Sequence, residues 1–298
     1  MPFDRTCRSS SATRSWRRSW RPPLRGSGQG RPAKKPTFAT RNPEPESMLI
    51  HELERRGNMF FRWRSFIPLI LVPPALVLAY QAPARAGDAG WQMMCWAVGV
   101  LGVVIRAKTI GHVPPGTSGR NTSEGQVAQT LNTRGMYSLV RHPLYLGNYF
   151  MWMALVLATG RLDFALLVTL AYMMYYLRIA MAEEAFLASK FGSTYSAWTA
   201  TVPAFVPKCW GTPRSSWTPA GNAFSMRHVI KREYNGVFAI VFGMFLLEAA
   251  RTAGLGAPAW NTLAWQSGLG SSVATFLFLR FLKKRTRVLH VEGREFSS

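Results

Sequence analysis

The sequence has few cysteines, few histidines and few acidic side chains for a chain of 298 residues. Its three cysteines lie far apart and form no CxxC pair, which argues against a disulfide framework and against a zinc ribbon. The five histidines lack the spacing of metal ligands, so no metal site is expected. The sequence also contains no internal repeat and no glycine-rich phosphate loop.

Acidic residues are outnumbered, with 14 Asp and Glu against 36 Lys and Arg, and the formal net charge is +22. Residues 1–47 hold eleven basic and three acidic residues in a stretch rich in Ser, Arg, Pro and Gly. This stretch resembles a disordered basic arm or a transit segment, and our preferred interpretation is that Met48 is the true start. No recognition motif accompanies the charge, so a nucleic-acid partner is not expected.

Long apolar runs characterise residues 48–298. A soluble protein with buried helices would also contain apolar runs, but so many of them would leave it without a polar surface. The sequence therefore predicts an all-α polytopic membrane bundle of about six transmembrane helices, with a core at 100–207 and an extra hairpin at 234–282. The six uncharged runs are Ser65–Tyr80, Trp91–Ile105, Pro143–Gly160, Phe164–Leu177, Tyr234–Leu247 and Pro258–Leu279.

The charges of the connecting loops predict the orientation of this bundle. Residues 106–141, 207–233 and 280–298 carry net positive charge, whereas the alternate loops are balanced. Because positive loops stay in the cytoplasm, both termini and the two long loops are predicted to be cytoplasmic.

A candidate site lies where the third apolar run begins. Pro143 suits the first position of a helix, which makes His142 the N-cap and leaves first-turn N–H groups to bind a carboxylate or phosphate. Gly147 would let another helix or a ligand approach the backbone closely. Interfacial Arg and Tyr residues that merely anchor the helix are the alternative interpretation.

A second signal is the acidic pair Glu183-Glu184, just beyond the fourth apolar run. The pair marks either a solvated helix end or a site for hydroxyls or positive charge. Since only a few residues join the third and fourth runs, the two helices should form an antiparallel hairpin. That hairpin would bring His142 and Glu183 to the same membrane face.

These motifs resemble a known family when they are taken in order. Gln129-Thr-Leu-Asn-Thr-Arg-Gly-Met-Tyr137 is followed by Val140-Arg-His-Pro-Leu-Tyr-Leu-Gly147, by Glu183-Glu184 with Phe191-Gly192-xx-Tyr195, and by Val202-Pro-Ala-Phe-Val-Pro207. The combination, over about residues 100–207, resembles the isoprenylcysteine carboxyl methyltransferase family. That group includes phospholipid methyltransferases and many bacterial relatives.

The resemblance implies an integral membrane methyltransferase of the bacterial inner membrane that uses S-adenosyl-L-methionine at its cytoplasmic face. It implies catalytic roles for Arg141, His142 and Arg178, although Arg178 lies one position from the family's substrate-contacting arginine. The cofactor positions that it implies are Gln129, Thr130, Leu131, Asn132, Tyr137, His142, Pro143, Leu144, Tyr145 and Glu183.

The acceptor is expected to be a membrane lipid or a lipidated molecule with an anionic oxygen. The bacterial branch that the sequence resembles suggests a lipid phosphate, such as that of lipid A, ahead of a carboxylate. The residues that would contact it are Arg120, Asn121, Arg178 and Arg232, although arginines next to a membrane also act as topology determinants. An amine acceptor would need His142 or Glu183 as a base.

Two other classes remain as alternatives. Membrane sterol reductases have a similar Arg-His motif and use NADPH, but their chains are longer. A non-enzymatic membrane protein would bind no cofactor at all. A binding comparison of NADPH with S-adenosylmethionine separates the three classes.

Overall fold

The computed structural model describes residues 60, 63, 66–81, 84–114, 121–122, 125–126, 128–207, 217–256 and 263–291. The basic segment 1–47 and Arg120 lie outside these residues, and at Asn121 only the backbone is described. The longer elements are α2 (Val72–Tyr80), α3 (Ala89–His112), α4 (Pro143–Ala158), α5 (Leu162–Thr199), α6 (Met226–Gly254) and α7 (Leu263–Arg285). The short ones are η1 (Ile67–Leu71), η2 (Ala84–Gly87), η3 (Gly135–Ser138) and the antiparallel pair β1 (Asn121–Thr122) and β2 (Gly125–Gln126).

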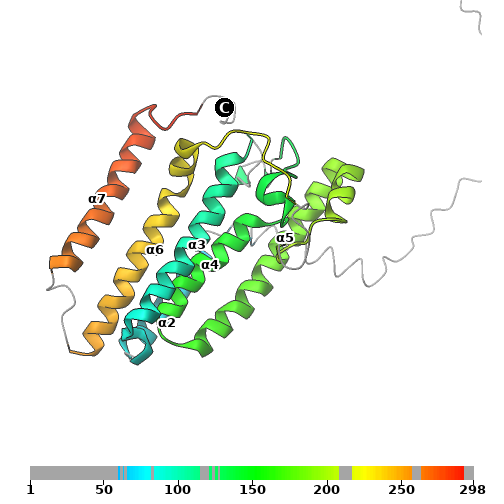
Figure 1. Ribbon diagram of the computed structural model, residues 1–298. Coiled ribbons are helices and arrows are strands. Elements are labelled where there is room, and N and C mark those ends of the chain that lie inside the picture. The colour runs from blue at the N-terminus through cyan, green and yellow to red at the C-terminus, as the bar shows by residue number, and fades with distance from the viewer. Residues whose placement is uncertain are drawn as a thin grey trace, which may run out of the picture. The chain divides into compact units, whose positions relative to one another are not determined.

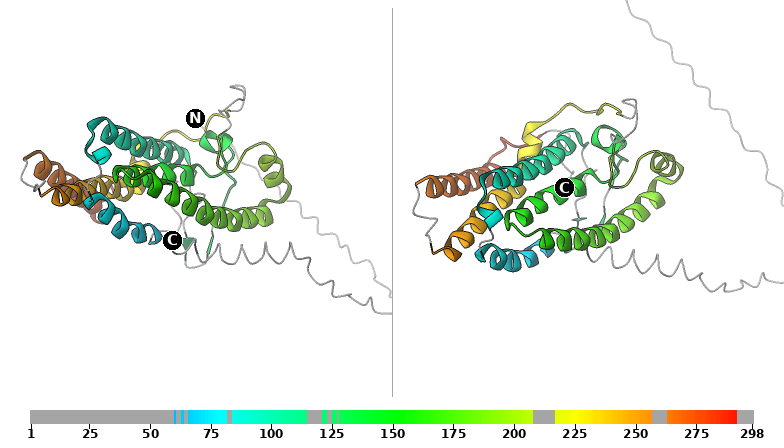
Figure 2. Two further views of the ribbon diagram at one scale, coloured as in Figure 1. Left: turned by 90° about the horizontal axis from the view of Figure 1, so that it is seen from below. Right: turned by 60° about the horizontal axis from the view of Figure 1, so that its bottom comes forward.

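The helices pack side by side in an order that differs from their order in the chain. Helix α6 packs between α7 and α3, and α4 packs between α3 and α5 (Figure 1). Figure 2 shows α2 and α3 on opposite sides of α4 in both views. Among the described residues, the regular secondary structure is thus helical apart from one pair of two-residue strands, as expected for a membrane helical bundle.

The expected number of six spans is not confirmed. Among the described residues, α3, α5 and α6 are long and apolar enough to cross a membrane, and Ile67–Tyr80 and Pro143–Ala158 are shorter apolar helices. Helix α7 does not qualify. Its polar residues, which include Gln266, Ser271 and Arg280, lower the mean hydropathy of the stretch.

Helix α4 begins where the sequence predicts, with Pro143 as its first residue and His142 as the N-cap. It forms an antiparallel hairpin with α5 through a turn in which Gly160 has a φ of 75°. That left-handed conformation is open to glycine at little cost.

Helix α5 is longer than the apolar run that predicts it. The run ends at Leu177, but the helix continues to Thr199 and bends at Gly192, where φ is 51° and ψ is −125°. Glu183 and Glu184 therefore lie within the helix, and the last turns of α5 fold back towards the site.

Close backbone contact joins α3 to α4. A Cβ atom on Gly102 would lie 2.7 Å from the carbonyl oxygen of Gly147, and one on Gly147 would lie 2.5 Å from Cγ of Arg106. The prediction that Gly147 admits another helix is therefore confirmed, and the helix is α3. Because the glycines let the helices touch, the long side chain of Arg106 is held against α4.

Candidate active site

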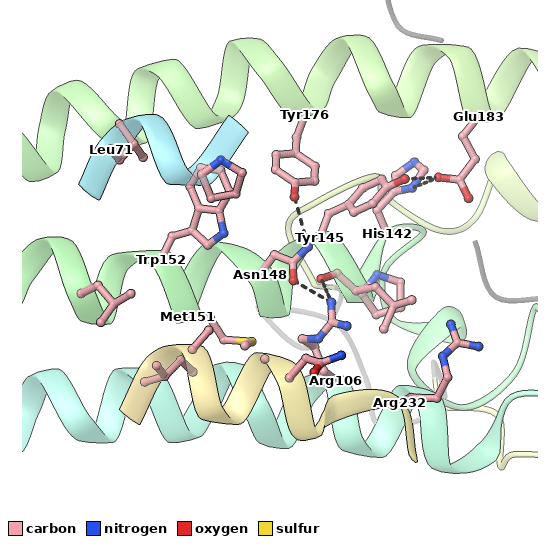
Figure 3. A pocket seen from close by; sticks show the side chains of 18 of the residues that line it. Leu71, Arg106, His142, Tyr145, Asn148, Met151, Trp152, Tyr176, Glu183 and Arg232 are labelled. Carbon is pink, nitrogen blue, oxygen red and sulfur yellow. Dashed lines mark hydrogen bonds and ion pairs between the residues drawn. The ribbon is translucent and has the colours of Figure 1, made fainter. Parts of the chain in front are cut away.

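One continuous cavity of about 840 Å³ runs between α2, α4, α5 and α6. Its polar end lies at the start of α4 and the start of α6, and its apolar end lies between α2, α4 and α6 (Figure 3). Among the residues that line the polar end are Thr130, Asn132, Tyr137, Arg141, His142, Tyr145, Glu183, Tyr195 and Arg232.

The acidic pair of α5 meets the start of α4 at the polar end. The Tyr145 hydroxyl donates a hydrogen bond to Glu183 Oε2 at 2.7 Å, and His142 Nε2 lies 2.8 Å from Glu184 Oε1. His142 Nδ1 is 3.7 Å from Glu183 Oε2, and Arg141 Nη1 donates to Glu184 at 2.7 Å. The expectation that His142 and Glu183 lie together is therefore confirmed.

Aromatic rings hold these groups in place. The His142 ring stacks on Tyr145 with centroids 5.3 Å apart and on Phe205 at 5.5 Å. The Tyr172 hydroxyl donates to the backbone oxygen of Tyr145 at 2.6 Å, and the rings of Tyr145 and Tyr176 are 4.8 Å apart. This packing leaves His142 only 6% exposed and fixes the direction of its ring nitrogens.

The segment before α4 is paired with the segment after α5. The N–H groups of Arg141 and His142 donate to the carbonyl oxygens of Pro203 and Ala204 at 2.8 and 3.2 Å. Trp198 Nε1 donates to the Tyr137 carbonyl at 3.2 Å. Motifs more than sixty residues apart in the sequence are thus neighbours.

Tyr137 lies on the loop that lines the polar end. Desolvation of its phenol, together with the nearby charge of Glu183, holds the pKa of Tyr137 well above its usual value. The phenol therefore stays neutral and remains a hydrogen-bond donor.

The Tyr195 hydroxyl and Arg141 Nε are buried on the cavity lining and form no hydrogen bond of ideal geometry with the described residues, although the Tyr195 phenol is close enough to Glu184 and Arg141 to interact with both. The polar end thus combines buried donors, a carboxylate and aromatic rings, and the chemistry of this set of groups suits S-adenosylmethionine. Its carboxylate needs such donors, its hydroxyls or amine suit Glu183, and its sulfonium suits the aromatic rings.

The first turn of α4 offers less to an anion than the sequence suggests. The N–H groups of Tyr145 and Leu146 both donate to the His142 carbonyl at 3.1 Å. Those two donors are occupied within the helix. The side chains around the cavity therefore carry more of the anion-binding capacity than the helix terminus does.

Most of the sequence-predicted residues meet at the cavity, and two described ones do not. Gln129 is exposed and outside the cavity lining. Arg178 also lies off the lining, and its guanidinium donates to the Met174 carbonyl of its own helix at 3.0 Å. The predicted residues that do line the cavity are Thr130, Leu131, Asn132, Tyr137, Arg141, His142, Pro143, Leu144, Tyr145, Glu183 and Arg232.

Sequence reasoning missed a buried ion pair, of which Arg106 lines the cavity. Arg106 donates through Nε and Nη2 to both oxygens of Glu233, at 2.6 and 2.7 Å, and through Nη1 to Asn148 Oδ1 at 2.6 Å. Asn148 donates in turn to the Tyr176 hydroxyl at 3.1 Å. Arg106 directly follows the apolar run that ends at Ile105, so the sequence gives it only as part of a positively charged loop. No local pattern pairs it with a residue 127 positions away.

Comparison with known proteins finds a family that matches part of the chain. Residues 92–194 match the phospholipid methyltransferase family, which confirms the resemblance seen in the motifs. These residues contain α4 and most of α5 with Glu183, but they do not include α6.

Among individual curated proteins, Protein-S-isoprenylcysteine O-methyltransferase of Schizosaccharomyces pombe is 30% identical over 36% of this chain and 45% of its own length. Cobalt-zinc-cadmium resistance protein CzcN of Cupriavidus metallidurans is 36% identical over 28% of this chain and 38% of its own. Nickel-cobalt-cadmium resistance protein NccN of Alcaligenes xylosoxydans xylosoxydans is 28% identical over 49% and 63%. The chain thus spans less than two thirds of each of these relatives. No solved structure matches it.

Proposed function

We propose that this chain is an integral membrane methyltransferase that uses S-adenosyl-L-methionine and methylates an anionic oxygen of a lipid-borne acceptor, a phosphate in preference to a carboxylate. The observation that carries the proposal is the continuity of this cavity, because it joins the polar residues around Glu183 to an apolar region between membrane-type helices. Such a cavity suits a polar methyl donor and an acceptor with a hydrocarbon chain. The family match supports the same reaction class.

The cofactor would bind at the polar end, with Glu183 towards its hydroxyl or amine groups and with Arg141 and Tyr195 towards its carboxylate. When bound, S-adenosylmethionine supplies a methyl group that forms a bond to the acceptor oxygen while sulfur keeps the electrons of the broken carbon–sulfur bond. An anionic oxygen already carries the attacking electron pair, so the chain needs to supply no base. Its residues align the reactants and exclude water.

His142 acts in this proposal mainly by position. Its ring is held between Tyr145 and Phe205 and contacts both acidic residues of α5. It therefore orients Glu183 and Glu184. Were the acceptor an amine, His142 or Glu183 would have to remove a proton, and activity would fall as pH drops.

The direct test incubates membranes that contain the protein with methyl-labelled S-adenosylmethionine and then extracts the lipids. We expect label in the extracted lipid that mild base does not release as methanol. Mild base releases methanol from carboxyl methyl esters but not from phosphate methyl esters. The variants His142→Ala and Glu183→Gln should lose the label, whereas Arg227→Gln, an exposed charge on α6, should keep it.

Cofactor binding by the purified protein separates the outcomes of this test. Binding without any lipid label would contradict the lipid acceptor but not the use of the cofactor. Absence of binding would contradict the methyltransferase itself. Binding of NADPH instead would indicate the reductase class.

A further inference from the structure

Helix α6 forms one side of the cavity although it lies outside the residues that match the methyltransferase family. Its lining residues recur every three or four positions, which is the spacing of one helix face. At the polar end this face carries one cation, Arg232, next to Asn235. Further along, the small residues Gly236, Ala239 and Gly243 alternate with bulky apolar residues such as Phe238 and Phe242.

The small residues of this face leave room in the cavity. A Cβ atom on Gly236 would lie 3.0 Å from Cε of Met151, and one on Gly243 would lie 2.8 Å from Cδ2 of Leu155. Met151 and Leu155 belong to α4 and also line the cavity. Larger residues on α6 would push these side chains into the space that the cavity occupies.

The opposite side of this space is entirely apolar. It is formed by the η1–α2 segment, and we call the region between that segment, α4 and α6 the chain slot. A hydrocarbon chain is the only ligand chemistry that such a lining favours. The residues of η1 and α2 that line the slot are Pro68, Leu69, Leu71, Val72, Ala75 and Leu76.

The buried ion pair sets the rotation of α6. Glu233 is 4% exposed and is held by both Arg106 contacts, so this position of α6 faces α3. Successive residues of a helix point about 100° apart. With Glu233 fixed, Arg232 extends into the polar end of the cavity from the α6 side, across from Glu183 (Figure 3).

We propose that α6 is the acceptor-binding element of this chain: Arg232 contacts an anionic phosphate headgroup, and the chain slot holds the attached hydrocarbon chain. The charges favour this division. Arg106 and Glu233 pair with each other, and Arg232 is the one cationic residue that α6 contributes to the described lining of the cavity. The Tyr195 hydroxyl, on a residue that is 6% exposed, adds a hydrogen-bonding group to the same end of the cavity. That the bound amphiphile is the methyl acceptor rests on the proposed function, whereas the binding of an anionic amphiphile at α6 does not.

The test uses the full-length protein in nanodiscs of phosphatidylcholine and a hexadecyl phosphate with a photoreactive diazirine in its chain. We expect crosslinks to α2 and to the cavity face of α6. An excess of hexadecyl phosphate should suppress them, whereas hexadecylphosphocholine and butyl phosphate should not. Hexadecylphosphocholine lacks a free phosphate monoester, and butyl phosphate lacks the long chain.

Two pairs of matched variants test the headgroup and the slot separately. Arg232→Gln should reduce crosslinking roughly ten- to hundredfold, as expected for the loss of a charge-assisted contact, and Arg227→Gln should not. Ala239→Trp fills the slot and should abolish crosslinking. Val237→Trp adds the same bulk to an exposed position off the cavity lining and should not.

Equal crosslinking in all four variants, or label spread over the outer surface of α6, would overturn the assignment. Cofactor binding, measured on the same samples, should be unchanged in Arg232→Gln and Ala239→Trp. Amphiphile binding without cofactor binding would contradict the proposed methyltransferase but not the α6 site. Cofactor binding without crosslinking would contradict the α6 site but not the proposed methyltransferase.

Discussion

Glu183 and Tyr145 are neighbours in space because two helices meet, and their hydrogen bond is 2.7 Å long. Each lines the cavity, so each can respond to a ligand there. At this scale the chain shows two kinds of charged contact. Around Glu183 the charges are partly exposed and face the cavity, whereas the Arg106–Glu233 pair is enclosed by three helices.

Removing the hydroxyl or the charge at the polar end should weaken cofactor binding. In Tyr145→Phe and in Glu183→Gln we expect affinity for S-adenosylmethionine to fall by about 1.5–3 kcal/mol, roughly ten- to hundredfold, because a contact with a charged group is lost. Calorimetry on purified protein measures the change. Both variants should still insert in the membrane, and unaltered affinity in both would remove these residues from the site.

Removing one charge of the buried pair should destabilise the fold. Glu233→Gln leaves Arg106 without its counter-charge, and we expect a loss of about 3–5 kcal/mol in the free energy of unfolding. The double variant Arg106→Met with Glu233→Met removes both charges and should be more stable than Glu233→Gln. Thermal unfolding in detergent makes the comparison, and the reverse order would show that the pair is not buried as described.

At the scale of elements, two glycines decide how close α3 and α4 come. In Gly102→Ala the new methyl group would lie 2.7 Å from a backbone oxygen, which cannot move aside without moving the helix. We expect destabilisation of about 1–3 kcal/mol and a displaced Arg106. On α7, Gly270→Ala has no atom within 4 Å of its Cβ and serves as the control for unfolding measurements.

The bend of α5 depends on a different property of glycine. A Cβ atom at Gly192 would contact no atom within 4 Å, so steric crowding does not require glycine there. The backbone of Gly192 has a φ of 51° and a ψ of −125°, a conformation that is strained for other residues. Gly192→Ala should cost about 1–3 kcal/mol and straighten the helix end that carries Tyr195 and Trp198. We expect weaker cofactor binding, while Ser193→Ala, at an exposed neighbour, should bind normally.

At the scale of the whole molecule, the distribution of charge predicts the orientation in the membrane. In a background with all three cysteines replaced by alanine, Leu255→Cys should react with a membrane-impermeant maleimide from outside the cell. Pro219→Cys should react only after permeabilisation, because its loop belongs to the positively charged side. Both positions are exposed. Reaction of Pro219→Cys in intact cells would place the candidate site on the opposite face.

Local sequence determined several features of this protein. The start of α4 follows from Pro143, because a proline ring suits the first helical position whatever surrounds it. The α4–α5 hairpin follows from a connection too short for any other arrangement. The apolar helices and the resemblance to the family that residues 92–194 match also follow from the sequence, because hydropathy and ordered motifs are properties of consecutive residues. The cofactor positions stay predictions.

Tertiary structure alone decided the rest. Helix α5 continues past Leu177, and there Arg141, His142 and Tyr145 meet the carboxylates of Glu183 and Glu184. The sequence predicts that His142 and Glu183 share a membrane face, but it does not show the individual contacts. The pairing of Arg106 with Glu233 requires α3 and α6 to touch, and it turns α6 so that Arg232 reaches the cavity. Such partners are separated by scores of residues, and only the packing of the helices brings them within bonding distance.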